Sequence, residues 1–366
     1  MSNLRKILGI LFTLALLGGV GGDIYLSMRE QLAEHVKVRG LIGSEKEEFF
    51  RDPRVIAALK AQGLEVQVQK AGSRQIATQP NLKEFDFAFP AGAPAAEKIR
   101  REQNIAKSFP VFFTPMAVAS WKRIAGILEA NGIVWKTDGI FYIIDMERLL
   151  DLCQRGARWT ELRQNDAYKV NKSILVNTTD IRHSNSAAMY LALASFVLNG
   201  KNIVASEAEA LPLADKLAPL FLRQGYQESS SAGPFSDYLV MGPGKAPLVM
   251  IYEGQYLFEA ARPDSGVSPD MALLYPEPTL FAKHILIPLN DRGDKLGRVL
   301  SESPELQQLA IEHGFRNADT KSFRAYVDGH KLAVPEVLVN VTEAPSYEIL
   351  ESMIQRIEQF ETGAAR

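Results

Sequence analysis

Short apolar runs and amphipathic segments alternate along most of the chain. Residues 37–42 are rich in apolar side chains that alternate with polar ones, which predicts a strand leading into the polar turn 43–46. Pro53 then begins a helical stretch with one apolar face, and Gly63 ends it before a second apolar run at 64–68. The first part of the chain therefore predicts a strand-helix-strand unit.

The same alternation continues through the middle of the chain. The predicted elements, in order, are strand 85–89, helix 95–106, strand 109–118, helix 120–131, helix 146–155, strand 173–176, helix 187–198, helix 211–225, strand 247–252 and the extended segments 271–275 and 284–289. Strands that alternate with helices indicate an α/β fold with a mainly parallel sheet covered on both faces. The last segments, 322–341 and 347–360, are predicted to return to the first part of the fold.

An uncharged apolar run, 7–22, follows Arg5 and Lys6 at the N-terminus. A basic flank before such a run is typical of exported proteins. Extended to Leu26, the run approaches the roughly 20 residues that cross a bilayer, with Asp23 at the outer interface. We therefore predict a single N-terminal transmembrane anchor, with a cleaved signal segment as the alternative. The body would lie outside the cytoplasm, held at the cytoplasmic membrane by the anchor, or periplasmic or secreted if the segment is cleaved.

Composition narrows the class of protein. A chain of 366 residues is long enough for two domains, and its formal net charge of −2 argues against nucleic acid as a partner. Cys153 is the only cysteine, so the chain can form no internal disulfide and no thiolate metal site. It also has no cysteine just after the apolar segment to carry a lipid.

No pattern typical of catalysis or metal binding is present. The five histidines form no His-Glu-x-x-His or His-x-His pattern, and neither Gly-x-Ser-x-Gly nor Gly-x-Gly-x-x-Gly follows a predicted strand. Segment 242–245 has the wrong spacing for a phosphate loop, and Ala246 stands where Ser or Thr would bind magnesium. Asp180, His183 and Ser184 are neighbours in sequence, which is not the geometry of a catalytic triad. We therefore expect a binding protein with no catalytic residues, no metal site and no cofactor.

Several short motifs occur in a fixed order along the chain. They are Gly43-Ser44 after the first strand, 113–119 before a helix that starts at a tryptophan, 177–186 before an apolar helix, 275–278, and a helix that begins at Pro304 and ends at Gly314-Phe315-Arg316. This series, from Lys37 to about Arg316, resembles type II periplasmic solute-binding proteins, the receptors that feed ABC importers. The resemblance implies a two-lobed α/β fold with two hinge crossings and a ligand cleft between the lobes.

The resemblance also implies a division of the chain into lobes. The expected parts are 1–36 as the signal or anchor helix with its linker, 37–115 as the first part of lobe I, 116–275 as lobe II, and 276–366 as the second part of lobe I with the C-terminal helix. The two crossings would lie near 112–117 and near 273–278.

Two helix starts present hydroxyls and backbone N–H groups that suit a ligand. These candidate ligand-binding residues are Gly43, Ser44 and Glu45 after the first strand, and Ser184, Asn185 and Ser186 before the apolar helix of the second lobe. Serine and asparagine at such positions can equally serve only as helix caps. Both interpretations stay open for these residues.

The resemblance adds candidate ligand-binding residues from the second lobe and the crossings: Thr114, Thr178, Thr179, Asp180, Arg182, Tyr252, Glu253 and Tyr275. Other roles stay open, because Asp180 and Arg182 can form a surface ion pair and the tyrosines can pack in the core with a satisfied hydroxyl. Glu45 and Lys46 differ from the small residues that simple oxyanion binders place after the serine. The class of ligand therefore stays open.

The sequence thus predicts an extracytoplasmic solute-binding protein that captures a small polar solute, with anions among the candidates, for transport or sensing. Its partners would be that solute, the membrane, and an ABC-type permease or another envelope protein. The alternative is a membrane-anchored scaffold or sensor of an envelope complex that reuses the same fold. Bulky side chains filling the cleft would favour this alternative, and an open polar cleft would count against it.

Overall fold

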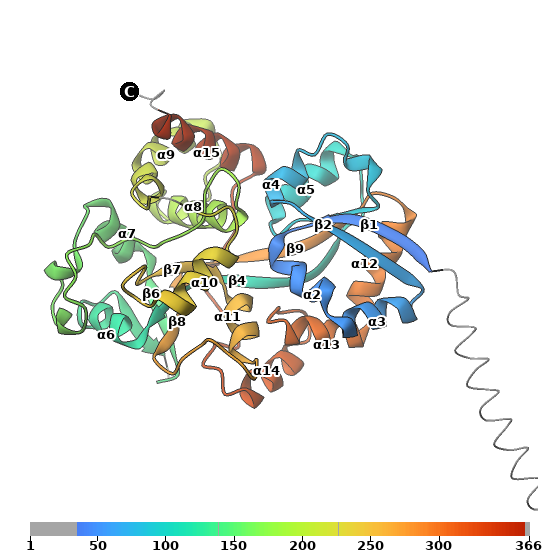
Figure 1. The fold of residues 1–366 in the computed structure, drawn as a ribbon. Coiled ribbons are helices and arrows are strands. Elements are labelled where there is room, and N and C mark those ends of the chain that lie inside the picture. Colours follow the sequence, from blue (N-terminus) through green and yellow to red (C-terminus); the bar gives the residue numbers. More distant parts are fainter. Residues whose placement is uncertain (1–34, 138, 226, 363–366) are drawn as a thin grey trace, which may run out of the picture.

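The computed structural model describes residues 35–137, 139–225 and 227–362 (Figure 1). The predicted signal or anchor run, 7–26, lies outside these residues. Within the described ranges, no helix combines the length and the apolar character that crossing a membrane requires. The described chain folds into two lobes of α/β structure, which lie side by side in Figure 1 and share long strands.

The first lobe is built on one end of the sheet, with strand order β2-β1-β3-β9. β1 (Val36–Ile42) pairs in parallel with β2 (Leu64–Lys70) and β3 (Phe87–Phe89), and β9 (Thr279–Pro288) runs antiparallel to β3. The helices of this lobe are α2 (Glu47–Arg51), α3 (Pro53–Ala61), α4 (Ser73–Ala77), α5 (Ala93–Glu102), α12 (Asp291–Glu302) and α13 (Pro304–Glu312), with 3-10 turns at Ser44–Lys46 and Leu82–Glu84.

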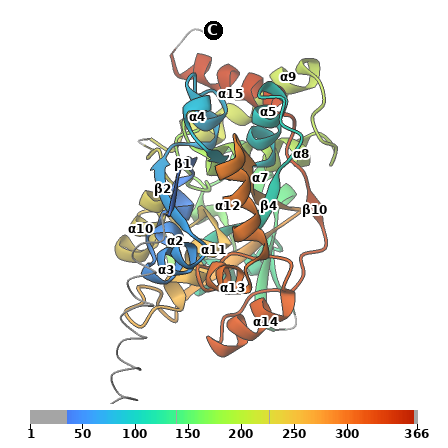
Figure 2. The same cartoon turned by 90° about the vertical axis from the view of Figure 1, so that its right-hand side faces the viewer.

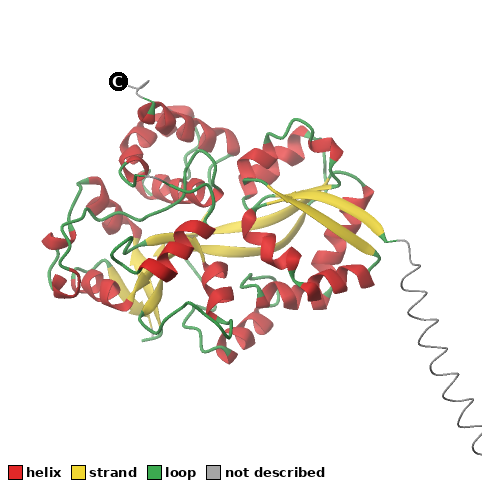
Figure 3. Ribbon diagram, viewed as in Figure 1, coloured by secondary structure: helices red, strands yellow, loops and turns green. Residues whose placement is uncertain are grey.

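The two faces of β1 explain the layers of this lobe. Val38 and Ile42 belong to a buried cluster with α3, α12 and α13, whereas Leu41 belongs to a cluster with α4 and α5. Successive side chains of a strand point to opposite faces, so an apolar strand of this kind is buried on both sides. Figure 3 shows helices on both sides of these strands.

The second lobe is built on the other end of the sheet, in the order β4 (Phe109–Trp121), β8 (Met271–Glu277), β6 (Phe141–Asp145) and β5 (Val134–Thr137), with β7 (Val249–Tyr252) also paired to β4. Its helices are α6 (Lys122–Ala130), α7 (Met146–Gln154), α8 (Asn185–Leu198), α9 (Glu207–Leu222), α10 (Ala232–Met241) and α11 (Glu253–Ala260), with 3-10 turns at Trp159–Glu161 and Asn165–Tyr168. One large cluster of buried side chains joins these elements. α8 is apolar and almost wholly buried, so it forms the middle of this core.

β4 belongs to both lobes. Its first half, 109–115, pairs with β9, and its second half, 116–121, pairs with β7 and β8. The chain returns to the first lobe between β8 and β9, at Pro278. Both passages lie in the segments predicted as crossings, 112–117 and 273–278.

One of the two C-terminal helices packs differently from the prediction. α14 (Thr320–Gly329) packs on α13 of the first lobe, as expected, whereas α15 (Tyr347–Glu361) places apolar side chains in the core of the second lobe. The apolar face of α15 packs mainly on α9, which is why the prediction fails. Its polar side reaches the first lobe, where Glu351 pairs with Arg74 of α4, and Figure 2 shows α15 next to α4 and α5. β10 (Val341–Thr342), just before α15, pairs in parallel with β9.

Two smaller expectations about local structure are wrong. The predicted strand 173–176 forms only an isolated bridge from Ser173 to Arg158, because this buried segment has no strand beside it along its length. Between the predicted helix 211–225 and the predicted strand 247–252 no element was expected, but α10 begins there at Ala232.

A buried ion pair lies beside the first crossing. The guanidinium of Arg316 donates to both oxygens of Glu253 at 2.7 Å, and Tyr275 donates its hydroxyl to the same carboxylate, also at 2.7 Å. Arg316 also donates to the two carbonyls of 335–336 at 2.7 and 2.9 Å. Its backbone exchanges two hydrogen bonds with Phe113 of β4. The pair therefore ties α11 of the second lobe to the crossing strand.

Replacement of Arg316 by leucine should destabilise the protein strongly. The change leaves the buried Glu253 carboxylate without its cation, which typically costs about 3–5 kcal/mol of unfolding free energy. The measurement is chemical denaturation of Arg316→Leu beside Arg324→Ala. The control removes an exposed pair with Asp328 and should cost less than about 1 kcal/mol. Equal losses in the two variants would contradict a structural role for the buried pair.

Candidate functional site

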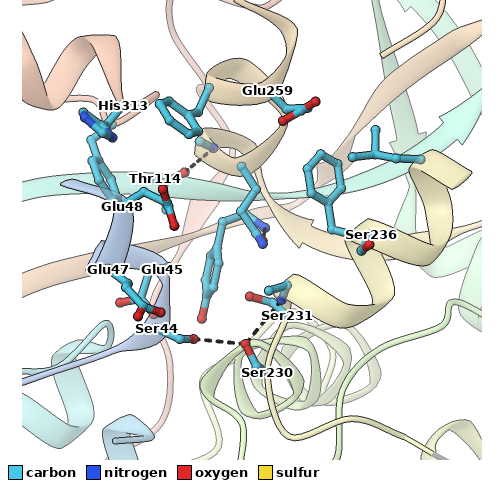
Figure 4. A pocket seen from close by; sticks show the side chains of 18 of the residues that line it. Ser44, Glu45, Glu47, Glu48, Thr114, Ser230, Ser231, Ser236, Glu259 and His313 are labelled. Carbon is cyan, nitrogen blue, oxygen red and sulfur yellow. Dashed lines mark hydrogen bonds between the residues drawn. The ribbon is translucent and has the colours of Figure 1, made fainter. Parts of the chain in front are cut away.

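The cleft between the lobes contains two adjoining cavities of about 410 and 440 Å³. Both cavities are lined by side chains of the two lobes, and six residues line both: Ser44, Glu45, Lys70, Ser230, Ser231 and Tyr252. We call the first cavity the aromatic compartment, after the phenylalanine and tyrosine rings that line it: Phe235, Tyr252, Phe258 and Phe315. We call the second the serine compartment, after its hydroxyls: Ser44, Ser73, Ser184, Ser229, Ser230 and Ser231. Figure 4 shows the aromatic compartment from close by.

Strand ends and helix starts build both sides of the cleft. From the first lobe, β1 ends at Ile42 and the turn 43–46 enters the cleft. From the second lobe come the starts of α8 at Asn185 and of α10 at Ala232, with α11 directly after β7. Ligand sites in α/β proteins form at such edges, because the N–H groups at helix starts lack partners within the helix.

Hydrogen bonds join the two lobes across the cleft. The hydroxyls of Ser44 and Ser230 lie 3.2 Å apart, as Figure 4 shows. Asn185 of α8 donates its side-chain amide to the carbonyl oxygen of Ala91 in the first lobe at 3.4 Å. The lobes therefore touch around the serine compartment, and the structure is a closed arrangement of the cleft.

The serine compartment contains a hydroxyl that is available to a ligand. Ser231, which precedes α10, lines the compartment, and its hydroxyl makes no hydrogen bond within the described ranges. At the start of α8, the hydroxyl of Ser184 bonds with that of Ser186 at 3.0 Å and leaves the helix start uncapped by a side chain. A polar group bound in the compartment would therefore find a hydroxyl and a helix start able to bond with it.

Carboxylates accompany the rings of the aromatic compartment: Glu45, Glu47, Glu48 and Glu259. Glu47 pairs with Lys70 at 2.7 Å. Glu259 pairs with Arg262 at 3.3 Å. Glu48 is exposed and has no ion pair among the residues that the structure describes. Among all the residues that the structure describes, no group of three His, Cys, Asp or Glu side chains could hold a metal ion.

A buried charge cluster lies behind the turn that enters the cleft. Lys46 is fully buried, forms an ion pair with Glu45, and donates to Nδ1 of His284 on β9 at 3.1 Å. Its ammonium also lies 4.8 Å from the ring centre of Phe89. Burial by itself would raise the pKa of Glu45, but Lys46 outweighs it and holds that pKa well below its usual range. Burial and then the charge of Lys46 lower the pKa of His284 to about 4. At neutral pH, Glu45 is therefore ionised and His284 is neutral.

Half of the predicted site residues line the cleft. Those that the structure brings together there are Gly43, Ser44, Glu45, Thr114, Ser184, Asn185 and Tyr252. Thr114 lines the aromatic compartment and accepts a hydrogen bond from the backbone of Gly254 at 3.0 Å. Tyr252 lies between the compartments, where its hydroxyl accepts from Asn185 at 3.0 Å.

The remaining candidates line neither compartment: Thr178, Thr179, Asp180, Arg182, Ser186, Glu253 and Tyr275. Asp180 and Arg182 pair with each other at 2.6 Å, which is the ion pair kept open as their alternative role. Thr179 bonds with Ser186 at 2.8 Å beneath the start of α8. Glu253 and Tyr275 belong to the buried network of Arg316, so these polar groups are satisfied within the protein.

Sequence reasoning missed the loop before α10 and the helix α2. Three consecutive serines, 229–231, precede an apolar helix, and this signal resembles the one that singled out Ser184. Glu47 and Glu48 belong to α2, a short helix with no feature that marks a ligand site. Phe258 and His313, whose rings stack at 4.7 Å, come from α11 and the end of α13. Only tertiary packing brings them to one cavity.

Acid should destabilise the protein through His284. Its pKa is about 4 in the folded protein and about 6.5 in an unfolded chain. Below about pH 6.5 the unfolded state therefore binds a proton on this histidine, whereas the folded state does not bind it until the pH falls to about 4. Stability is lost as the pH falls through this window, by up to about 1.4 kcal/mol per pH unit. Chemical denaturation at pH 7 and pH 5 should show a smaller loss for His284→Gln than for the unmodified protein.

The control for this prediction is another histidine. Part of the acid sensitivity should remain in His284→Gln, because burial also lowers the pKa of His313. His330 is exposed on the surface, so His330→Gln should lose as much stability between pH 7 and pH 5 as the unmodified protein does. The prediction fails if His284→Gln loses as much stability as the unmodified protein between the two pH values.

Comparison with known proteins finds similarity at the level of structure. No family model matches the chain, and no curated protein matches it. Iron-bound HitA from Pseudomonas aeruginosa is similar with a TM-score of 0.52 and 11% identity, over 90% of this chain and 100% of that chain. The periplasmic binding protein P5PA is similar with a TM-score of 0.51 and 12% identity, over 90% and 99% of the two chains.

A third solved structure gives the same result. The apo ferric ion-binding protein A of Pasteurella haemolytica has a TM-score of 0.51 and 11% identity, over 88% of this chain and 94% of that chain. At these identities the similarity concerns the fold, and it extends over nearly the whole length of each protein. The chain therefore has the two-lobed α/β fold of the periplasmic binding proteins.

Proposed function

We propose that this chain is an extracytoplasmic solute-binding protein that captures a small polar solute between its lobes, for transport or sensing. The observation that carries the proposal is the cleft itself. Its two compartments, about 410 and 440 Å³, lie within the size range of small-molecule sites and are lined by polar groups of both lobes. The protein would bind this solute without converting it.

Lobe closure supports the proposed capture of a solute. The lobes are connected through β4, through the passage from β8 to β9 and through the segment from α13 to α15, and connections of this kind can act as a hinge. In the closed arrangement, the bond between Ser44 and Ser230 crosses the cleft. A solute that contacts both lobes would stabilise this arrangement relative to an open one.

The proposed location and partner rest on the sequence and on its resemblance to solute-binding receptors. The apolar run 7–26 would place the body outside the cytoplasm, as an anchor in the cytoplasmic membrane or as a cleaved signal. An ABC-type permease or another envelope protein would receive the solute or the signal. The scaffold alternative is less well supported, because bulky side chains do not fill the cleft.

Binding of a solute should raise the melting temperature of the full-length protein. A ligand at 100 times its dissociation constant adds about 2.7 kcal/mol to the free energy of unfolding. The measurement is a thermal-shift screen against amino acids, amines, sugars, small carboxylates and oxyanions. Ser231→Ala removes a hydroxyl from the centre of the cleft and should reduce the shift given by the best compound.

The control is Ser352→Ala on α15, which lines neither compartment and should keep the full shift. If no compound shifts the melting temperature of a folded sample, the solute-binding proposal is wrong. An equal shift in both serine variants would place the bound solute elsewhere on the protein.

A further inference from the structure

Resting on the proposed function, we infer that the solute is an organic ammonium compound with a second, oxygen-bearing end. The ammonium group binds in the aromatic compartment, and the oxygen-bearing end, a hydroxyl or an anionic group, binds in the serine compartment. The inference depends on the different chemistry of the two compartments and on the orientation of Glu45 between them.

The charges around the aromatic compartment favour a cation. Four glutamates line it against two basic side chains, Lys70 and Arg262, which gives a formal charge of −2. Counting the buried Lys46 behind Glu45 reduces this to −1. Glu48 is the lining carboxylate for which the described ranges hold no cationic partner. An ammonium group would supply that partner, whereas an inorganic oxyanion would be repelled.

The rings of the aromatic compartment also suit an ammonium group. Tyr252 and Phe258 come from the second lobe, and Phe315 lies at the end of α13 in the first. The face of an aromatic ring attracts a cation, and several rings around one cavity stabilise an organic ammonium better than a small hydrated ion. The carbon chain of the solute would pack on the same rings.

Glu45 is held so that one of its oxygens is available to a ligand. Its Oε1 bonds with Lys46, but its Oε2 has no partner within the described part of the chain, although the side chain is only 7% exposed. Gly43 permits this position, because an added Cβ there would lie 2.3 Å from Oε1 and 2.4 Å from Oε2. An ionised acceptor that lines both cavities and has a free oxygen suits a donor on the solute.

The serine compartment complements this arrangement. Its lining contains Glu45 and Lys70, whose charges cancel, together with hydroxyls and the starts of α8 and α10. The hydroxyl of Ser231 lines this compartment and makes no hydrogen bond within the described residues, and helix starts favour negative charge. This compartment therefore accepts the oxygen-bearing end of the same solute, and the two ends fix its direction in the cleft.

The test uses matched pairs of compounds that differ in the ammonium group. 5-Aminopentanoate is compared with pentanoate, and phosphocholine with 3,3-dimethylbutyl phosphate, in which a carbon atom replaces the ammonium nitrogen, by calorimetric titration of the full-length protein. The ammonium member of each pair should bind at least about tenfold more tightly. Its affinity should fall when sodium chloride is raised from about 0.05 to about 0.5 M, because Glu48 is exposed to solvent.

The variant Glu48→Gln tests the site of the ammonium group. Glu48 is exposed, so the fold should tolerate the change, and binding of the ammonium compounds should weaken about fivefold. The matched control is Glu161→Gln, an exposed glutamate that lines neither compartment, and it should bind as the unmodified protein does.

The outcomes separate this inference from the function on which it rests. If compounds without an ammonium group bind as tightly as their partners, or if only sugars or oxyanions from the thermal-shift screen bind, the ammonium inference is wrong and solute binding stands. Equal affinity of Glu48→Gln and Glu161→Gln for the ammonium compounds also overturns it. If no compound of any class binds to the folded protein, both proposals are wrong.

Discussion

The buried ion pair between Arg316 and Glu253 is the interaction on which the arrangement of the two lobes depends. It lies where β4 leaves its pairing with β9 and begins to pair with β7 and β8. Two charges inside a protein are stable only when paired and hydrogen-bonded, and here Tyr275 and two backbone carbonyls complete the network. The network holds the first turn of α11 and the end of α13 against β4, and these elements carry part of the cleft wall.

A second buried pair, Lys46 with Glu45, determines the chemistry of the cleft. The positive charge of Lys46 balances the negative charge of the Glu45 carboxylate and keeps this carboxylate ionised. A charged acceptor can therefore exist in a mostly buried position. His284 on β9 completes this cluster, which links the turn after β1 to a crossing strand. In the proposed function, structural stability and ligand recognition would therefore depend on the same three side chains.

Local signals predicted the elements of this fold better than their final packing. The apolar strand β1 and the apolar helix α8 were visible in the pattern, because each depends on neighbouring residues. α15 was placed with the wrong lobe, since an amphipathic helix shows which face is buried and not which partner buries it. Likewise, Glu253 and Tyr275 were polar residues at plausible positions, but Arg316, distant in sequence, satisfies them inside the protein.

The sequence by itself determined the α/β class and the serines and glycine at the end of β1 and before α8, because periodicity and helix caps are local properties. The positions of the two crossings followed from the family resemblance and not from local pattern. Tertiary structure alone decided that the loop 229–231 meets Ser44, that Phe258 and Phe315 share a cavity with Glu48, and that the cleft has one acidic, aromatic side and one hydroxyl-rich side. These contacts join residues far apart in the chain, and their positions depend on how helices of both lobes pack around β4 and β9.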